Sequence, residues 1–389
     1  MNPYVITWGV SDKHGWGLIG VHLSLHLMKL GRNPLLVTPA VDISRPEYAE
    51  KIMPLNSSVQ MFQDAFASAP NQKVMSDQMD VLHGTGNDFM ETEEGRRTWG
   101  KRNICMTFFE EQLMDEANMA RANRFDGIVT GSTYNYELLK NAGLDHVYLS
   151  FQGIDPYELV PKKASGRFGD KFVVFSGGKL EYRKGQDLVV KAFKIFHERH
   201  PDSLLLTNWV NFWPEVARGV NESCTLEVDL NPDLGPDYMT QWAVANGIPS
   251  EAFVDLGVMK RASLSQLFAD VDVALFPNRC EGGTNLVCNE TMFCRVPTIL
   301  SANTGHLDMM PEDKDVCIAL KKQTALDEQG GKRMGWMESD IEEMVEALEY
   351  AYQNREETQK MARRAASFVG RERTWQGFAK DCVAIFDKI

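Results

Sequence analysis

The stretch DVALFPNRCEGGTNLVCNETMFCRVPTILS, residues 272–301, contains the elements that decide the fold. It opens with an apolar run that predicts a strand ending near Pro277, and it closes with a second apolar run, VPTILS. Between these runs, a glycine-containing loop at 281–285 leads into a predicted short helix at 286–293. A strand, a helix and a second strand in this order are typical of a parallel sheet covered by helices.

The same alternation extends along both halves of the chain. In the N-terminal half we expect strands at Tyr4–Trp8, Pro34–Thr38, Asp80–His83, Asn103–Phe108, Gly127–Thr130 and His146–Ser150, and helices at Leu18–Leu30 and Glu111–Ala122. In the C-terminal half the runs KFVVFSGG, SLLLTNW and FVDLGV predict further strands, and Gly185–His200 predicts a helix. The fold class expected is α/β, with two doubly wound, Rossmann-like domains facing a cleft.

The segment DPYELVPKKASGRFGD at 155–170 interrupts this alternation and is typical of a linker. The 389 residues are therefore expected to form an N-terminal domain over 1–160 and a C-terminal domain over 166–365. Residues 366–389 include an amphipathic helix that could pack on either domain, including back on the first. One face of this helix carries Trp375, Phe378, Ala379, Cys382, Val383 and Phe386.

The composition narrows the class of protein. A net charge of −13 argues against non-specific binding of nucleic acid. The seven cysteines show no CxxC spacing, which indicates reduced thiols, mostly in the core, of a cytoplasmic protein. Cys280, Cys288 and Cys294 lack the partners of a zinc site, so no metal is expected. The sequence shows neither a signal peptide at its start nor an apolar run of 18 residues.

The segment HGWGLIG at 14–20 contains Gly15, Gly17 and Gly20 in the spacing G-x-G-x-x-G. A dinucleotide site also needs an acidic residue at the end of the second strand, where this chain has Val37 and Thr38. A nicotinamide cofactor is therefore not expected. Two alternatives remain: the glycines let a helix lie close to a strand, or the loop faces a ligand in a cleft.

Three cations follow the strand expected to end at Phe175: Lys179, Arg183 and Lys184. Gly177 and Gly178 are expected to form a tight turn before them. Ligands of open α/β sheets bind at the carboxyl ends of strands, so this cluster favours an anion such as a diphosphate. The alternative is a solvated charge run, but cations at the start of a helix oppose its dipole.

The loop at 281–285 offers a second anion-binding feature. Gly282, Gly283, Thr284 and Asn285 expose backbone N–H groups at the start of the predicted helix. Glu290 lies within that helix, and its side chain leans towards the N-terminus, where a carboxylate suits sugar hydroxyls. Glu281 could meet a second sugar. Each acid alone is more often a surface residue, but together with the cations they indicate a nucleotide-diphosphate sugar.

These segments resemble the retaining glycosyltransferases of the GT-B fold, family 4, clearly over about 125–310. GKLEYRKGQDL resembles the family's G-R-x-x-x-x-K-G segment, in which Lys184 matches the diphosphate lysine and Lys179 stands where an arginine is usual. VDLGVMKRASLSQLFADVDVALFPN resembles the stretch that meets the base, here Gly257–Met259. FDGIVTGSTYNYELLKNAGLDHVYLSFQGID resembles the end of the family's first domain.

EGGTNLVCNETMFCRVPTI resembles the family's E-x7-E segment. By this resemblance Glu290 would hold the ribose and Glu281 the transferred sugar. Gly282 and Gly283, with Thr284, Asn285 and Leu286, would supply backbone amides to sugar and phosphate. Eight residues separate the two acids instead of seven, which leaves the role of Glu281 open.

The family also has a histidine near the reacting sugar, after a strand of the first domain. His83 and His14 are the candidates here, although the family register falls nearer Thr85. The family's first loop is glycine-rich and lies over the cleft, which implies that Gly15 and Gly17 face the donor or the acceptor. Met259 would meet the base.

The expected activity is transfer of a sugar from a nucleotide-diphosphate donor to an acceptor hydroxyl, with retention and without metal or cofactor. The candidate catalytic residues are Lys184, Glu281 and His83. Alternatives on the same fold are an epimerase, a phosphorylase or a non-catalytic sugar-nucleotide-binding protein. The acceptor, whether saccharide, lipid or protein, stays open. The segment EEGRRTWGKRN at 93–103 could touch an anionic membrane, although such a run is more often a solvated loop.

Overall fold

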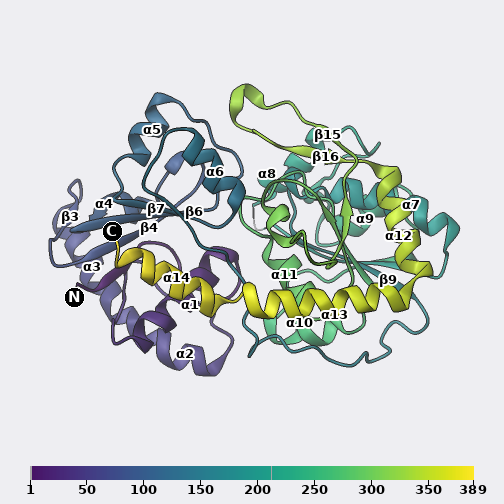
Figure 1. Cartoon of the computed structure of the whole chain (residues 1–389), viewed down its shortest axis with the longest axis horizontal. Coiled ribbons are helices and arrows are strands. Elements are labelled where there is room, and N and C mark those ends of the chain that lie inside the picture. The colour runs from purple at the N-terminus through teal and green to yellow at the C-terminus, as the bar shows by residue number, and fades with distance from the viewer. Residues whose placement is uncertain (1, 212) are drawn as a thin grey trace. The chain divides into compact units, whose positions relative to one another are not determined.

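The structure is a computed structural model that describes residues 2–211 and 213–389, and it contains two compact units (Figure 1). Unit 1 comprises Met1–Asp155, Glu328–Met334 and Glu372–Ile389, and unit 2 comprises Pro156–Asp327 and Gly335–Arg371. The chain thus changes unit at Asp155, at the start of the expected linker.

Unit 1 is built on a six-stranded parallel sheet in the order β2-β1-β4-β6-β7-β8. The strands are β1 (Tyr4–Ile6), β2 (Leu35–Leu36), β4 (Asp80–Thr85), β6 (Arg102–Thr107), β7 (Gly127–Thr130) and β8 (Val147–Leu149). A short pair, β3 (Val74–Met75) and β5 (Thr98–Trp99), lies outside this sheet. All residues of β1, β4 and β7 are buried, as expected for strands covered on both faces. Each of the six expected strands is present.

The helices of this unit are α1 (Gly15–Lys29), α2 (Pro46–Ile52), α3 (Ser57–Ser68), α4 (Glu93–Arg97), α5 (Glu116–Ala122), α6 (Thr133–Asn141) and α14 (Trp375–Phe386). The helix expected at Glu111–Ala122 begins only at Glu116. The reason is the N-cap residue Asp115, whose side chain accepts a hydrogen bond from the backbone N–H of Asn118.

Helix α14 packs beside α1 in unit 1 (Figure 1). The rings of Tyr4 and Phe386 lie 5.4 Å apart, and the hydroxyl of Ser150 donates to the backbone carbonyl of Phe378 at 3.2 Å. The apolar face expected for this helix is buried. The C-terminal helix therefore completes the core of the unit that the N-terminal half of the chain begins.

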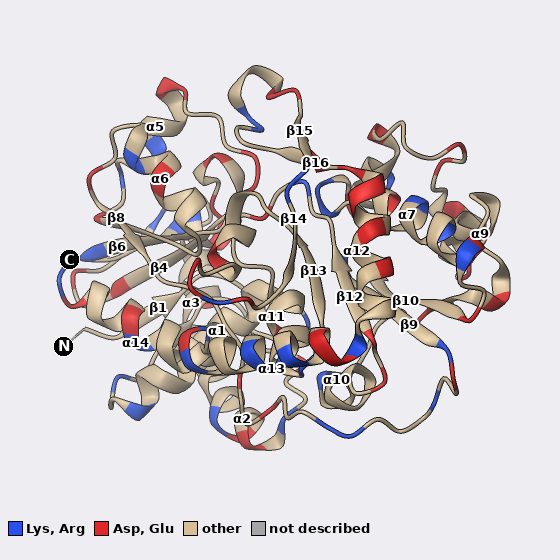
Figure 2. Cartoon of the chain, turned by 45° about the vertical axis from the view of Figure 1, so that its right-hand side comes forward, with Lys and Arg blue, Asp and Glu red and all other residues tan. Residues whose placement is uncertain are grey.

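Unit 2 contains a second six-stranded parallel sheet in the order β11-β10-β9-β12-β13-β14. Figure 2 labels β9, β10, β12, β13 and β14 of this sheet. Its strands are β9 (Phe172–Lys179), β10 (Ser203–Val210), β11 (Phe253–Asp255), β12 (Val273–Phe276), β13 (Thr298–Ser301) and β14 (Ile318–Leu320). A hairpin joins β15 (Gln323–Ala325) and β16 (Met337–Ser339). The two parallel sheets confirm the expected α/β class with two Rossmann-like domains.

The helices of unit 2 are α7 (Gln186–Arg199), α8 (Pro214–Ala217), α9 (Tyr238–Ala245), α10 (Arg261–Phe268), α11 (Leu286–Phe293), α12 (Ile341–Gln353) and α13 (Arg355–Glu372). Helix α11 has the bounds expected from the sequence. The core between α7, α12 and the sheet includes Phe193, Phe196, Leu205 and Leu348, which are all fully buried.

The expected turn at Gly177 and Gly178 is wrong. Strand β9 does not end at Phe175 but continues to Lys179, and both glycines pair with residues of β10. A Cβ on Gly177 would lie 2.7 Å from the ring of Phe175, and Gly178 has a φ of 124° that favours glycine. The glycines therefore allow close packing within a strand.

Five cysteines are buried, namely Cys105, Cys280, Cys288, Cys294 and Cys382, which confirms the prediction that most thiols lie in the core.

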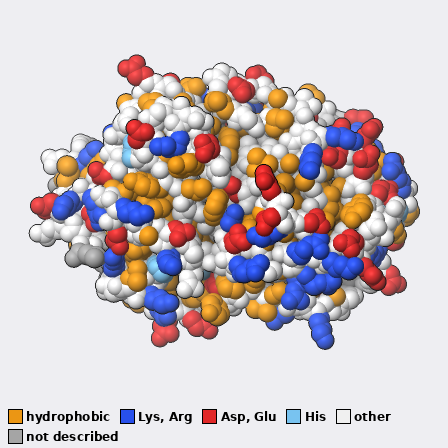
Figure 3. All heavy atoms as spheres, viewed as in Figure 1, with side chains coloured by type: hydrophobic (Ala, Val, Ile, Leu, Met, Phe, Trp, Pro, Cys, Tyr) orange, Lys and Arg blue, Asp and Glu red, His pale blue; other side chains and the backbone are white. Residues whose placement is uncertain are grey.

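Within the described ranges, no group of three or more His, Cys, Asp or Glu side chains is placed to hold a metal ion. None of the described helices combines the length and the apolar character needed to cross a membrane. Acidic and basic side chains are interspersed on the face seen in Figure 3.

Candidate functional site

The candidate residues of unit 2 follow two neighbouring strands at the centre of its sheet. β9 and β12 pair in parallel, so their carboxyl ends meet at the same edge of the sheet. Lys179 ends β9, and Gly185 approaches the loop after β12 so closely that a Cβ would lie 2.5 Å from the carbonyl oxygen of Pro277. This close approach brings the two loops together at the edge where ligands of open α/β sheets bind.

Lys184 and Glu281 meet at this edge in a buried ion pair between Nζ and Oε1. The same carboxylate oxygen accepts a hydrogen bond from Nδ2 of Asn278 and lies 3.3 Å from Nη1 of Arg183. Burial alone would raise the pKa of Glu281, but Lys184 and Arg183 outweigh it and lower the pKa to about 2. Glu281 is therefore ionised at neutral pH.

Glu181 forms ion pairs with the other two cations of the cluster, Lys179 and Arg183. Nη2 of Arg183 lies 2.6 Å from Oε1 of Glu181, and Nζ of Lys179 lies 3.3 Å from its Oε2. Lys179 also approaches the ring of Trp213, with Nζ 5.2 Å from the centroid. Three cations against the two carboxylates Glu181 and Glu281 leave this cluster with a net positive charge, which suits an anionic ligand.

The loop at 281–285, called the glycine loop below, rests on the segment Thr304–Met309, which is a short 3-10 helix. The backbone N–H of Glu281 donates to Oγ1 of Thr304 at 2.9 Å, and the N–H of Gly305 donates to the carbonyl of Glu281 at 3.0 Å. A Cβ on Gly305 would lie only 1.8 Å from the carbonyl oxygen of Gly283. Only glycine fits at 305 without moving the loop.

His306 holds the end of the loop from within the core. Its Nε2 lies 3.1 Å from Nδ2 of Asn285, and its Nδ1 lies 2.9 Å from Oγ of Ser301. Burial lowers the pKa of His306 to about 4, although the charge of Glu281 opposes this shift. The neutral ring thus accepts from Asn285 and donates to Ser301, a tautomer assigned from these bonds.

Asn285 is the N-cap of α11, with a φ of 58°, and its side chain accepts from the backbone N–H of Cys288 at 3.3 Å. In the part of the chain that the structure describes, the backbone N–H groups of Gly283, Thr284 and Asn285 donate to no protein group. These donors lie at the positive end of a helix dipole, so they can take an anion.

Glu290 lies in the second turn of α11 and is buried. Its Oε1 is 2.8 Å from Nη2 of Arg261, the first residue of α10. Nε of Arg261 also donates to Oε2 of Glu158 at 3.0 Å. The structure thus pairs the expected ribose residue with a buried arginine that the sequence patterns do not single out.

The expected base-contacting segment follows β11. The carbonyl of Gly257 accepts a hydrogen bond from Nδ2 of Asn208, and its N–H donates to Oδ2 of Asp255 at 3.2 Å. Val258 is exposed and Met259 is half-buried. The segment is therefore held by its backbone while its side chains remain accessible.

The segment at 14–20, expected as a loop before a helix starting at Leu18, is instead the start of α1, which begins at Gly15 directly after its N-cap His14. A Cβ on Gly17 would lie 2.3 Å from the carbonyl oxygen of Ser11, and one on Gly20 would lie 2.7 Å from Cγ2 of Val10. Nδ1 of His14, the N-cap of α1, accepts from the N–H of Gly17 at 3.0 Å. The glycines let the helix lie close to the strand region, one of the two alternatives. Contact of Gly15 or Gly17 with a ligand stays a prediction.

His83 lies in β4 with no exposed surface. Its Nε2 is 3.2 Å from Oδ1 of Asn103, and its ring packs against Trp99 and Phe125. Burial lowers the pKa of His83 to about 4. Its role near a reacting sugar stays a prediction, and a fully enclosed ring gives that role no support.

The segment at 93–103 is tied into unit 1. Nη2 of Arg97 donates to the carbonyls of Phe66 and Ala69, and Nη2 of Arg102 pairs with Asp80 at 2.6 Å. Of its four cations, Arg96 and Lys101 are exposed. A membrane contact through this segment stays a prediction.

A buried ion pair supports the loop between β12 and α11. Arg279 is fully buried and donates through two nitrogens to Asp187, at 2.8 and 2.6 Å.

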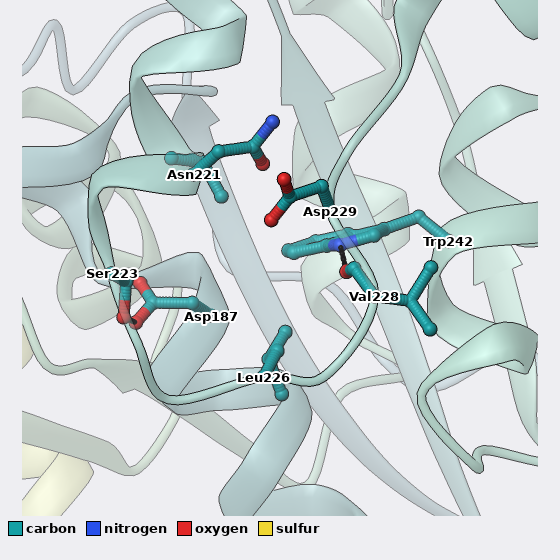
Figure 4. A pocket seen from close by; sticks show the side chains of 8 residues that line it. Asp187, Asn221, Ser223, Leu226, Val228, Asp229 and Trp242 are labelled. Atoms are coloured by element: carbon teal, nitrogen blue, oxygen red, sulfur yellow. Dashed lines mark hydrogen bonds between the residues drawn. The ribbon is translucent and has the colours of Figure 1, made fainter.

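A cavity of about 10 Å³ lies beside Asp187 and Ser223 (Figure 4). It has room for about one water molecule, so this cavity is no nucleotide site.

A comparison with protein-family profiles gives no match, and a comparison with curated protein sequences gives none either. Solved structures do match over the full chain. Sucrose-phosphate synthase from Thermosynechococcus elongatus gives a TM-score of 0.66 at 12% identity, with 100% of this chain and 99% of that chain covered. Anabaena HepE in complex with UDP-glucose gives 0.65 at 12% identity, covering 99% and 100%.

Trehalose-6-phosphate synthase OtsA gives a TM-score of 0.65 at 11% identity, with 100% and 99% covered. These neighbours are glycosyltransferases with two Rossmann-like domains. The chain therefore has the GT-B fold. At these identities the likeness is one of fold.

Proposed function

We propose that the protein transfers a sugar from a nucleotide-diphosphate sugar to an acceptor hydroxyl, with retention at the anomeric carbon and without a metal ion. One observation carries this proposal: the N–H groups of Gly283, Thr284 and Asn285 have no protein partner in the described part of the chain, and Lys184 lies beside the same loop. Open N–H donors and a cation are the groups that a diphosphate needs.

The main chemical task is to stabilise the departing diphosphate. Lys184, Lys179 and the N-terminus of α11 can take this charge through donors that are in place before the reaction. The His306–Asn285 and Thr304–Glu281 hydrogen bonds fix the loop, so little reorganisation is needed when charge develops. We propose that Glu290 binds the ribose and that Gly257–Met259 border the base.

The two acids are poorly suited to act as a nucleophile. Glu281 is held by Lys184, Arg183 and Asn278, and Glu290 is paired with Arg261. Retaining glycosidases instead place an available carboxylate against the sugar. We therefore propose front-face attack assisted by the leaving phosphate. In this reading Glu281 fixes Lys184 and meets the transferred sugar with its remaining acceptor capacity.

The first donor to test is UDP-glucose, because a HepE structure holds it. Purified protein is incubated with UDP-, GDP- and ADP-sugars, with and without mixed saccharide, lipid and protein acceptors. Transfer predicts nucleoside diphosphate release that depends on the acceptor. Release that requires inorganic phosphate instead indicates a phosphorylase, a changed sugar without release indicates an epimerase, and binding without turnover indicates a non-catalytic protein.

Lys184→Ala should lower turnover per folded molecule, with the folded fraction measured by circular dichroism, by about 10²–10³-fold, the usual effect of removing one group that stabilises developing charge. Lys360→Ala is the matched control, because Lys360 is an exposed lysine of unit 2 paired with Glu357. Equal turnover in both variants would contradict the proposed role of Lys184.

A further inference from the structure

The ion triad around Arg261 is the basis of this inference, which rests on the proposed function. Arg261 is 10% exposed, and its partners Glu290 and Glu158 are 7% and 9% exposed. Nη2 lies 2.8 Å from Oε1 of Glu290, while Nε donates to Oε2 of Glu158 at 3.0 Å. One guanidinium thus engages two buried carboxylates through two different nitrogens.

The triad has an unusual charge for a buried cluster. One arginine and two acids sum to −1, and an excess negative charge is costly to bury. Burial lowers the pKa of Arg261, but Glu290 and Glu158 outweigh it and raise the pKa overall. Further hydrogen-bond donors would offset the remaining negative charge.

Glu290 is the member that can accept them. Its Oε1 faces Arg261, and its Oε2 accepts no hydrogen bond from any residue in 2–211 or 213–389. Glu290 lies in the second turn of α11, whose N-terminus carries the open N–H groups of the glycine loop. A sugar diol joined to a diphosphate on that loop would place its hydroxyls towards this oxygen.

We propose that Arg261 is a positioning residue for the donor ribose. Arg261 holds the carboxylate of Glu290 by the ion pair at Oε1 and leaves Oε2 for the ribose hydroxyls. The guanidinium suits this task because its planar fork fixes direction as well as charge, which a lysine ammonium does not. Arg261 itself does not touch the donor.

The test measures how strongly the protein requires the ribose hydroxyls. Dissociation constants are measured by calorimetry for UDP, GDP and ADP and for their 2′-deoxy and 3′-deoxy counterparts. For each base, the ribose ratio is the larger of the two dissociation constants for the deoxy diphosphates, divided by the dissociation constant for the natural diphosphate. Wild-type protein should give a ratio of at least about tenfold, as expected for a hydrogen bond to a charged group.

Arg261→Ala should lower the ribose ratio towards one, as should Glu290→Gln. Arg261→Lys should give an intermediate ratio, since it restores the charge without the fork. Arg364→Ala is the control, because Arg364 is an exposed arginine of unit 2 paired with Asp315, and it should keep the wild-type ratio. The ratio compares ligands on one variant, so a loss of folded protein does not mimic the result.

A wild-type ratio in both Arg261→Ala and Arg261→Lys would overturn the inference. The inference would also be overturned if wild-type protein binds a diphosphate with a ribose ratio near one. That result would leave the proposed donor site in place. If wild-type protein binds none of the three diphosphates, the proposed function fails, and the inference fails with it.

Discussion

Nζ of Lys184 and the carboxylate of Glu281 form a buried ion pair across 97 residues of sequence. The pair joins the loop that follows β9 to the loop that follows β12. Both side chains are less than a tenth exposed, at 9% and 5%. Removing one partner would leave the other charge buried and uncompensated, which is strongly destabilising.

The pair predicts an acid-sensitive contribution to stability. The pKa of Glu281 is lowered from 4.5 to about 2, so its contribution is present above pH 4.5 and is lost as pH falls from 4.5 to 2. Glu281→Gln should lower the free energy of unfolding at pH 7 by a few kcal/mol, at about 1.4 kcal/mol per pKa unit. Urea denaturation at pH 7, 4 and 3 measures this, and Glu357→Gln, which removes an exposed acid, is the control. An unchanged pH dependence in Glu281→Gln would contradict the prediction.

The buried His306 predicts a second pH range, between 6.5 and 4, over which the free energy of unfolding changes. Burial lowers its pKa from 6.5 to about 4, so the unfolded chain binds a proton where the folded chain does not. The free energy of unfolding should therefore fall as pH drops from 6.5 to 4. His306→Gln should flatten this slope by up to about 1.4 kcal/mol per pH unit. Denaturation at pH 7, 5.5 and 4.5 tests it, and a slope equal to that of wild type would refute it.

Gly305 predicts a link between loop geometry and ligand binding. Gly305→Ala places a methyl group 1.8 Å from the carbonyl oxygen of Gly283, so the glycine loop must shift. The expected results are a loss of about 1–3 kcal/mol in stability and at least about tenfold weaker binding of nucleoside diphosphate. Gly219→Ala is the control, since its Cβ would meet only Oε1 of Glu222 at 3.9 Å. Calorimetry and urea denaturation distinguish the two variants, and equal binding by both would count against a loop-based site.

The sequence predicts the elements best where the pattern is local. Strand β7 and helix α11 have the expected bounds. An apolar run marks β7, and the N-cap Asn285 marks the start of α11. The end of β9 is wrong, since Gly177 and Gly178 normally indicate a turn, and only pairing with β10 keeps them in a strand. β14 does not appear among the expected strands, and its three residues give little periodic signal.

The site is predictable only as far as its motifs reach. Lys184, Glu281 and Glu290 stand out by spacing and resemblance, and the structure places Lys184 against Glu281. Arg261 and His306 do not stand out, because their partners Glu290 and Asn285 lie on other elements. A buried arginine or histidine carries no local pattern, so only the tertiary structure identifies it.

The position of α14 in unit 1 has a consequence for how the chain is synthesised. Ser150 and Phe378, which bond within this unit, are 228 residues apart, and nearly all of unit 2 is translated between them. Until α14 emerges from the ribosome, the surface of α1 that it covers remains open to solvent or to chaperones. Truncations that remove residues 372–389 should therefore leave this surface of unit 1 uncovered and make the shortened protein prone to aggregation.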